Sequence, residues 1–109
     1  MPDLNQTTIP RSFIDLFIAP GAIKTSAPRD AIAARYDLCE DMAQMLTEHA
    51  RAIAMELGVA DDEVIARVQR GLLADGSVVT RDEAQWITRR LAELLDWPQP
   101  APTDTAPAA

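Results

Sequence analysis

The stretch from Arg29 to Leu57 contains neither glycine nor proline, and no other feature constrains the fold as strongly. Its apolar residues recur at alternating spacings of four and three, which is the heptad pattern of a long α-helix. Gly58 follows at the position where a left-handed glycine commonly ends a helix. We therefore predict one long helix whose main apolar row is Ile32, Tyr36, Cys39, Ala43, Leu46, Ala50, Ile53 and Leu57.

A second row, mostly apolar, lies beside the first and leaves only about a third of the circumference polar. About 28 residues form a rod of roughly 42 Å, whereas a compact chain of this size has a radius of gyration of about 13 Å. The helix therefore either bends or extends under a second copy of the chain. We expect a homodimer or an unidentified protein partner on this helix, with Met42 and Met45 as candidate interaction residues in the row Ala34, Leu38, Met42, Met45, His49 and Ala52.

Shorter helices are predicted on both sides of the long one. Pro10 can occupy a first helical turn, and Pro20 with Gly21 ends a helix of about two turns. After Gly58, a third helix is expected to start with Asp61 or Asp62 as its cap and to end near Ala74. Gly71 inside that helix costs about 1 kcal/mol relative to alanine, which favours a close helix crossing there.

The last helix has the clearest start signal in the sequence. In the segment TRDE, the Thr80 hydroxyl and the Glu83 carboxylate are spaced to form a reciprocal capping box. Its predicted core face contains Ala84, Ile87, Leu91, Leu94 and Leu95. The third and fourth helices thus form a C-terminal hairpin.

These elements predict an all-α fold: a small four-helix domain over residues 9–97 with one short helix, one long helix and the C-terminal hairpin. Residues 1–8 show no periodicity, and the Pro/Ala-rich residues 98–109 suit a polyproline-like tail, so both ends are predicted to be disordered. A hydrophobic content of 48% suffices for one core, and 5% aromatic residues favour helices over a β-sandwich.

Charge limits the possible partners. A net charge of −7 and a single lysine, Lys24, argue against binding to nucleic acid, which needs clustered basic residues. No stretch reaches the roughly 18 apolar residues of a membrane span, and no export signal is visible. The lone cysteine, Cys39, cannot form an intramolecular disulfide, so we expect a reducing, cytoplasmic setting.

The chain offers little catalytic chemistry. A calcium loop around Asp75 and Gly76 would lack most of its oxygen ligands, so a turn between helices is the better interpretation. The four glycines are scattered and form no phosphate-binding loop. His49, the only histidine, is interpreted as a half-buried structural residue. We therefore predict a protein that is not an enzyme and has no cofactor or metal.

One flank of the last helix carries further candidate interaction residues. Trp86 and Arg90 lie on the same side, away from the leucine face, and such pairs resemble the anchors of protein interfaces. The alternative is that Trp86 covers the edge of the core. A DNA-binding regulator would instead use Arg81, Gln85, Arg89 and Arg90 on the hairpin.

Three segments, IPRSFIDLFIAPG, SAPRDAIAARYDLCEDMAQML and RRLAELLDW, resemble a group of short, uncharacterised bacterial proteins sometimes labelled "ATPase with chaperone activity". The similarity spans most of residues 9–97. The label implies a nucleotide site, but no residues of this chain match one, so the activity is not carried over. The resemblance implies a small bacterial cytoplasmic protein.

Together these observations predict a non-catalytic protein-interaction or adaptor protein. An accessory subunit or small enzyme using His49 and nearby carboxylates is one alternative. A DNA-binding regulator using the C-terminal hairpin is the other.

Overall fold

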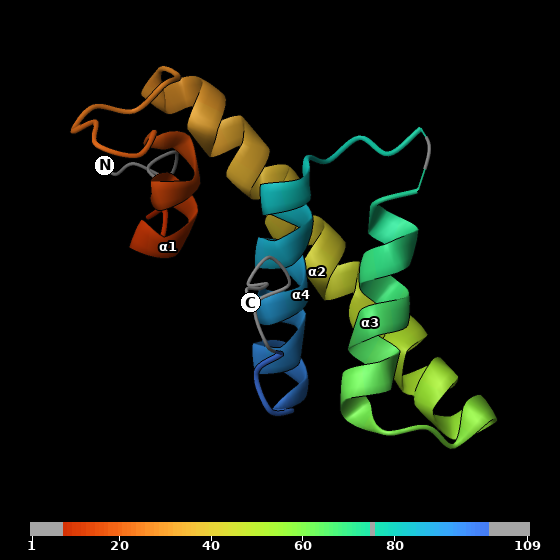
Figure 1. The fold of residues 1–109 in the computed structure, drawn as a ribbon. Helices are drawn as coiled ribbons and strands as arrows, with labels where there is room; N and C mark the ends of the chain where they lie inside the picture. Colours follow the sequence, from red (N-terminus) through yellow and green to blue (C-terminus); the bar gives the residue numbers. More distant parts are fainter. Residues whose placement is uncertain (1–7, 75, 101–109) are drawn as a thin grey trace. The chain divides into compact units, whose positions relative to one another are not determined.

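A computed structural model describes residues 8–74 and 76–100, and every regular element in these residues is helical (Figure 1). This confirms the predicted all-α fold with a short N-terminal helix, one long helix and a C-terminal hairpin. The elements are α1 (Arg11–Ile14), the 3₁₀ helix η1 (Asp15–Phe17), α2 (Arg29–Leu57), α3 (Asp61–Leu72) and α4 (Arg81–Leu95).

The chain divides into two compact units, Met1–Leu38 and Cys39–Ala109, and the boundary falls inside α2. The first unit contains α1, η1 and the start of α2, and the second contains the rest of α2 with α3 and α4. The units share one continuous helix, so the single domain expected over residues 9–97 stays a prediction. Within the described residues, no helix is long and apolar enough to cross a membrane.

Aromatic packing organises the first unit. Phe13 in α1 is fully buried, and its ring centroid lies 5.5 Å from that of Phe17 and 5.5 Å from that of Tyr36, which belongs to α2. A helix of four residues is not stable alone, because nucleation is costly. These ring contacts supply the tertiary packing that the short helix needs.

The second unit has its core where α2, α3 and α4 meet. The heptad row of α2 contributes the fully buried Cys39, Ala43 and Ala50, as its spacing predicts. Small side chains in this row leave room for larger ones from the packed helices. The hairpin supplies these from Val64, Ile65, Val68 and Leu72 of α3 and from Ala84, Ile87, Leu91 and Ala92 of α4, all of them buried.

The start of α3 differs from the sequence prediction. Its N-cap is Ala60 in extended conformation, without a side-chain cap, so neither Asp61 nor Asp62 is the cap. Both acids lie in the first helical turn with Glu63. There they stabilise α3 through the positive end of its dipole instead of through a capping hydrogen bond.

The capping box of α4 is confirmed. The Glu83 backbone N–H donates to the Thr80 hydroxyl at 3.1 Å, and the Thr80 backbone N–H donates to the Glu83 carboxylate at 2.9 Å. Glu83 is buried, so this pairing satisfies a carboxylate that would be costly to bury alone. Gly76, in the turn before the cap, has φ +83°, and Asp75 lies outside the described residues.

The first residues of the predicted tail fold back and contact α4. Residues 98–100 are described, and the Gln99 side chain donates to the Arg89 carbonyl at 3.3 Å. The Arg89 guanidinium in turn donates to the Pro100 carbonyl at 3.4 Å. Residues 1–7 and 101–109 lie outside the described part of the chain. The disorder predicted for them therefore stays a prediction.

Gly71 does not mark a close helix crossing, contrary to the sequence prediction. A Cβ atom added there would meet nothing within 4 Å, and the residue is exposed. The missing side chain therefore leaves an open notch on α3 instead of allowing another helix to approach.

Gly71→Ala is expected to stabilise the protein by about 0.5–1 kcal/mol, because alanine has the higher helix propensity and the site has room for its methyl group. Urea denaturation followed by circular dichroism measures the change. Gly76→Ala is the matched control and should destabilise, because its left-handed φ disfavours a side chain. A lower urea midpoint for Gly71→Ala than for the wild type would contradict this prediction, because it would mean that the site has no room for the methyl group.

Candidate protein-interaction site

The second apolar row of α2 is largely uncovered in the second unit. Met45 is 73% exposed, His49 and Ala52 are exposed, and Met42 is half-buried. We call these four residues the α2 surface. The broad apolar surface of α2 predicted a partner on this helix, and the described chain covers mainly the heptad row. Contiguous apolar residues left exposed in this way mark candidate interaction sites.

A shallow hollow of about 230 Å³ adjoins the α2 surface, between α2 and α3. His49 belongs to both, so the row and the hollow form one continuous site. The hollow is lined by Leu46, His49, Arg67, Val68, Gly71 and Leu72. Its walls therefore combine aliphatic side chains with one imidazole and one guanidinium.

Arg67 and Gly71 line the hollow but are not among the site residues predicted from the sequence. They are four positions apart and so lie on the same face of α3. The signal in the sequence is a glycine one helical turn after an arginine. This spacing could have predicted an open notch beside the Arg67 side chain. In the sequence alone, a glycine at this position instead favours close packing of another helix.

His49 is exposed, so the expected half-buried structural histidine is wrong. His49 directly precedes the buried Ala50 and lies beside the heptad row, where the described chain leaves it uncovered. The described lining of the hollow contains no carboxylate, and Arg67 is engaged by Glu63 at 3.1 Å within α3. The hollow therefore has His49 and the Glu63-paired Arg67 in its lining, and no carboxylate among the lining residues that the structure describes.

Trp86 is 8% exposed, which corrects the expected exposed flank of α4. The reason is the width of the buried face: Glu83, Ala84, Trp86, Ile87 and Thr88 are all buried on consecutive turns of this helix. The core face predicted from the sequence is narrower and does not include Trp86. The alternative interpretation, that Trp86 covers the edge of the core, agrees with this burial, and the interaction role of Trp86 stays a prediction.

Arg90 forms the central ion pair of the second unit. Its Nε and Nη2 donate to the two carboxylate oxygens of Glu40 at 2.8 and 3.0 Å, and Nη1 donates to Glu93 at 3.1 Å. The side chains of Arg90 and Glu40 are only 33% and 18% exposed. This bidentate geometry joins α2 to α4, and the Arg90 side chain serves an internal contact.

The pair shifts the ionisation of both partners. Hydrogen bonds from Arg90 lower the pKa of Glu40 below its ordinary value of 4.5, against the opposing effect of burial. A further hydrogen bond from the Gln44 side chain at 2.8 Å acts in the same direction. The hydrogen bond to Glu40 likewise raises the pKa of Arg90 above its ordinary range. Both groups are therefore held in their charged forms.

The same pair bears on the DNA-binding alternative. Of its four residues, Arg81 and Arg89 are exposed and Gln85 is half-buried, but Arg90 is held between two carboxylates. Phosphate would have to compete with both of them. This setting gives the hairpin less positive potential than its sequence suggests.

Residues 8–74 and 76–100 contain no group of three or more histidine, cysteine or acidic side chains that could hold a metal ion. Cys39, the one cysteine, is fully buried in the core of the second unit.

No known protein family matches the chain, and neither curated proteins nor solved structures provide a match. The resemblance to the short bacterial proteins described above therefore stays a prediction. The assignment of a function rests on the geometry of the site.

Glu40→Gln is expected to lower the free energy of unfolding at pH 7 by about 1–2 kcal/mol, because a charge-assisted bidentate pair is lost. The pKa of Glu40 is lowered in the folded state, so its charge stabilises the protein above its ordinary pKa of 4.5. That contribution is lost as the pH falls through the folded-state pKa. Denaturation from pH 3 to 7 should therefore show wild type and variant converging in acid.

Glu93→Gln is the control for this experiment, because it removes the exposed partner of the same arginine. Exposed pairs contribute about 0–1 kcal/mol, so its effect should be the smaller one. Equal losses for the two variants, or a Glu40→Gln difference that does not depend on pH, would contradict a dominant Glu40–Arg90 pair.

Proposed function

We propose that the protein is a non-catalytic protein-interaction or adaptor protein of the bacterial cytoplasm. The observation that carries the proposal is the uncovered apolar row of α2, with Met45 73% exposed at its centre. The unidentified partner would be a protein that covers the α2 surface and reaches into the adjoining hollow.

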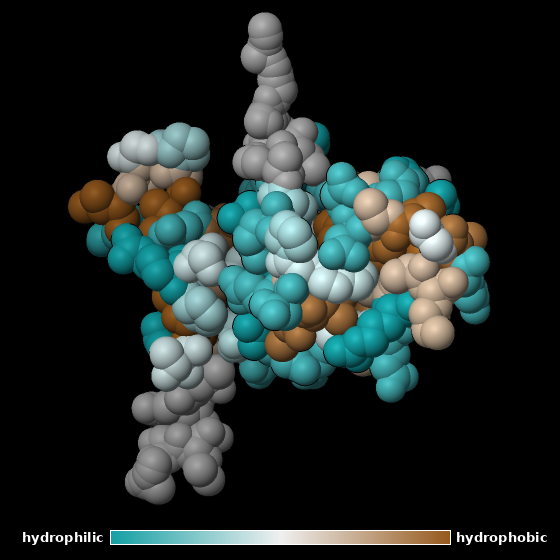
Figure 2. Space-filling view, turned by 90° about the horizontal axis from the view of Figure 1, so that it is seen from below, coloured by the Kyte–Doolittle hydropathy of each residue, from teal (hydrophilic) through white to brown (hydrophobic). Residues whose placement is uncertain are grey.

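The chemistry of the α2 surface suits a protein partner. Burying an exposed methionine side chain contributes about 1.5–3 kcal/mol, and its flexible thioether adapts to an irregular partner. Ala52 is small and allows a backbone to approach. Figure 2 shows hydrophobic residues that remain exposed among hydrophilic ones.

A second copy of the chain is one such partner. Two α2 helices could pair through their methionine rows, which would give the homodimer expected from the length of the helix. Such pairing would bury the α2 surface, just as binding of a different protein would. Sedimentation at several concentrations separates the two cases, because only a homodimer depends on the concentration of this chain alone.

An accessory subunit or small enzyme is a second candidate, and the observation that favours it is His49 exposed at the rim of a hollow. Its imidazole is accessible to a ligand, as a proton-transfer role requires. The described lining offers Arg67 as the only other ionisable side chain, which is consistent with binding an anion rather than with an acid–base pair.

Met45→Glu is expected to abolish partner binding while the fold survives, because it places a charge at the centre of the α2 surface. Affinity capture from the native cell, with identification of the co-purified protein, measures the loss. Circular dichroism and sedimentation of the variant establish its folding and its oligomeric state.

Met55→Glu is the matched control. Met55 is 86% exposed on the same helix, but ten residues after Met45 it points about 80° away around the axis. Capture should therefore persist in Met55→Glu. Equal capture by both variants and the wild type, together with a monomer at every concentration, would overturn the α2 surface as the site.

A further inference from the structure

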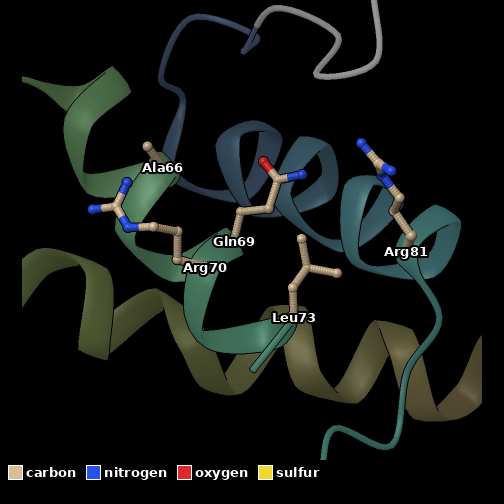
Figure 3. Close-up of a pocket in the computed structure, with 5 residues that line it drawn as sticks. All are labelled: Ala66, Gln69, Arg70, Leu73 and Arg81. Carbon is tan, nitrogen blue, oxygen red and sulfur yellow. The ribbon is translucent and has the colours of Figure 1, made fainter. Parts of the chain in front are cut away.

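A second hollow, separate from the α2 surface, lies between α3 and α4 and has a volume of about 270 Å³. Figure 3 shows its five lining residues, Ala66, Gln69, Arg70, Leu73 and Arg81. Pockets for whole small molecules have volumes of about 300–1,000 Å³. This hollow is smaller, and its size suits one inserted side chain rather than a complete small ligand.

The inner surface of the hollow can receive an apolar group. Leu73, which follows the last residue of α3, is 43% exposed, and Ala66 lies two turns earlier on the same helix. The methylene stems of the two arginines add apolar surface around them. An aliphatic side chain inserted here would gain contacts that water does not supply.

Two guanidinium groups border this apolar surface. In Figure 3, Arg70 of α3 and Arg81 of α4 lie on opposite sides of Leu73, with the Gln69 amide between the two helices. The Arg70 guanidinium lies 3.7 Å from the Glu63 carboxylate, and the Arg70 side chain is 65% exposed. Such a long, exposed ion pair contributes little, so Arg70 can exchange it for a ligand carboxylate.

Arg81 occupies a position that does not favour the stability of α4. It is the first residue of the helix, where the dipole is positive and an acidic residue would be stabilising. The same turn also carries Asp82 and Glu83, and Glu83 is held in the capping box, so the positive charge beside the hollow comes from the Arg81 guanidinium itself and not from the helix terminus. A residue that opposes its own helix is expected where binding, and not folding, decides the side chain.

We propose that this hollow binds an acidic segment of a partner protein, with one aliphatic side chain inside and flanking carboxylates on Arg70 and Arg81. Guanidinium groups recognise carboxylates through paired hydrogen bonds, which matches the rim, and the apolar interior matches the central side chain. Nucleic acid would need a broader basic surface than two arginines on a chain with a net charge of −7. The site is independent of the α2 surface and would be a second contact region.

The test is a titration of the ¹⁵N-labelled full chain with the blocked peptide Glu-Glu-Leu-Glu-Glu, followed by NMR. The expected result is a set of shifts at the Gln69 side-chain amide and the backbone amides of Leu73 and Arg81. The double variant Arg70→Gln/Arg81→Gln should bind at least about tenfold more weakly. Arg51→Gln is the matched control and should bind like the wild type, since Arg51 is an exposed arginine of α2 outside the hollow.

Arg81→Glu separates binding from folding. It should abolish the shifts while the thermal midpoint stays equal or rises, because an acid suits the first turn of α4. Three results would overturn the proposal: no shifts at millimolar peptide, equal binding of the peptide with glycine in place of leucine, or equal weakening by Arg51→Gln. Preferential binding of a single-stranded oligonucleotide would assign the hollow to nucleic acid instead. None of these results depends on Met45, so each is distinguishable from a failure of the α2 surface.

Discussion

The uninterrupted helix α2 is the constraint on which the rest of the structure depends. Its buried row in the second unit is made of small side chains, with Cys39, Ala43 and Ala50 fully buried. These small residues form a narrow buried face, and the larger side chains of α3 and α4 pack against it. The hairpin therefore covers only part of the apolar surface of α2. The exposure of Met45 is the direct consequence, because α2 has more apolar surface than the described chain covers.

Electrostatics has a different role on the two sides of α4. Towards α2, Arg90 is used internally, because Glu40 binds it through two hydrogen bonds and keeps both groups charged. At the start of the helix, Arg81 is exposed beside an apolar hollow and opposes the helix dipole. Arg90 thus forms an internal ion pair, whereas Arg81 lines a surface hollow. The difference comes from the neighbouring helices and not from the arginine side chain itself.

The two candidate contact regions also differ in chemistry. The α2 surface is apolar, with an imidazole at its edge, and suits a partner that buries methionine. The hollow between α3 and α4 has a basic rim and suits carboxylates around an aliphatic side chain. Two surfaces with separate preferences are what an adaptor requires, since it must hold two partners without competition between them.

The sequence by itself determined the helices and the signals at their ends. The absence of glycine and proline from Arg29 to Leu57, the stop at Gly58 and the capping box of Thr80 and Glu83 are local effects, and local effects are readable from spacing. Tertiary structure alone decided which apolar and charged faces are covered. Trp86 is buried because α4 is covered over a wide arc, and His49 is exposed because its row is not. Arg90 pairs with a residue fifty positions away, and Gly71 opens a notch instead of closing one. Burial and long-range pairing depend on how helices pack, and the periodicity of a single helix carries no information about its neighbours.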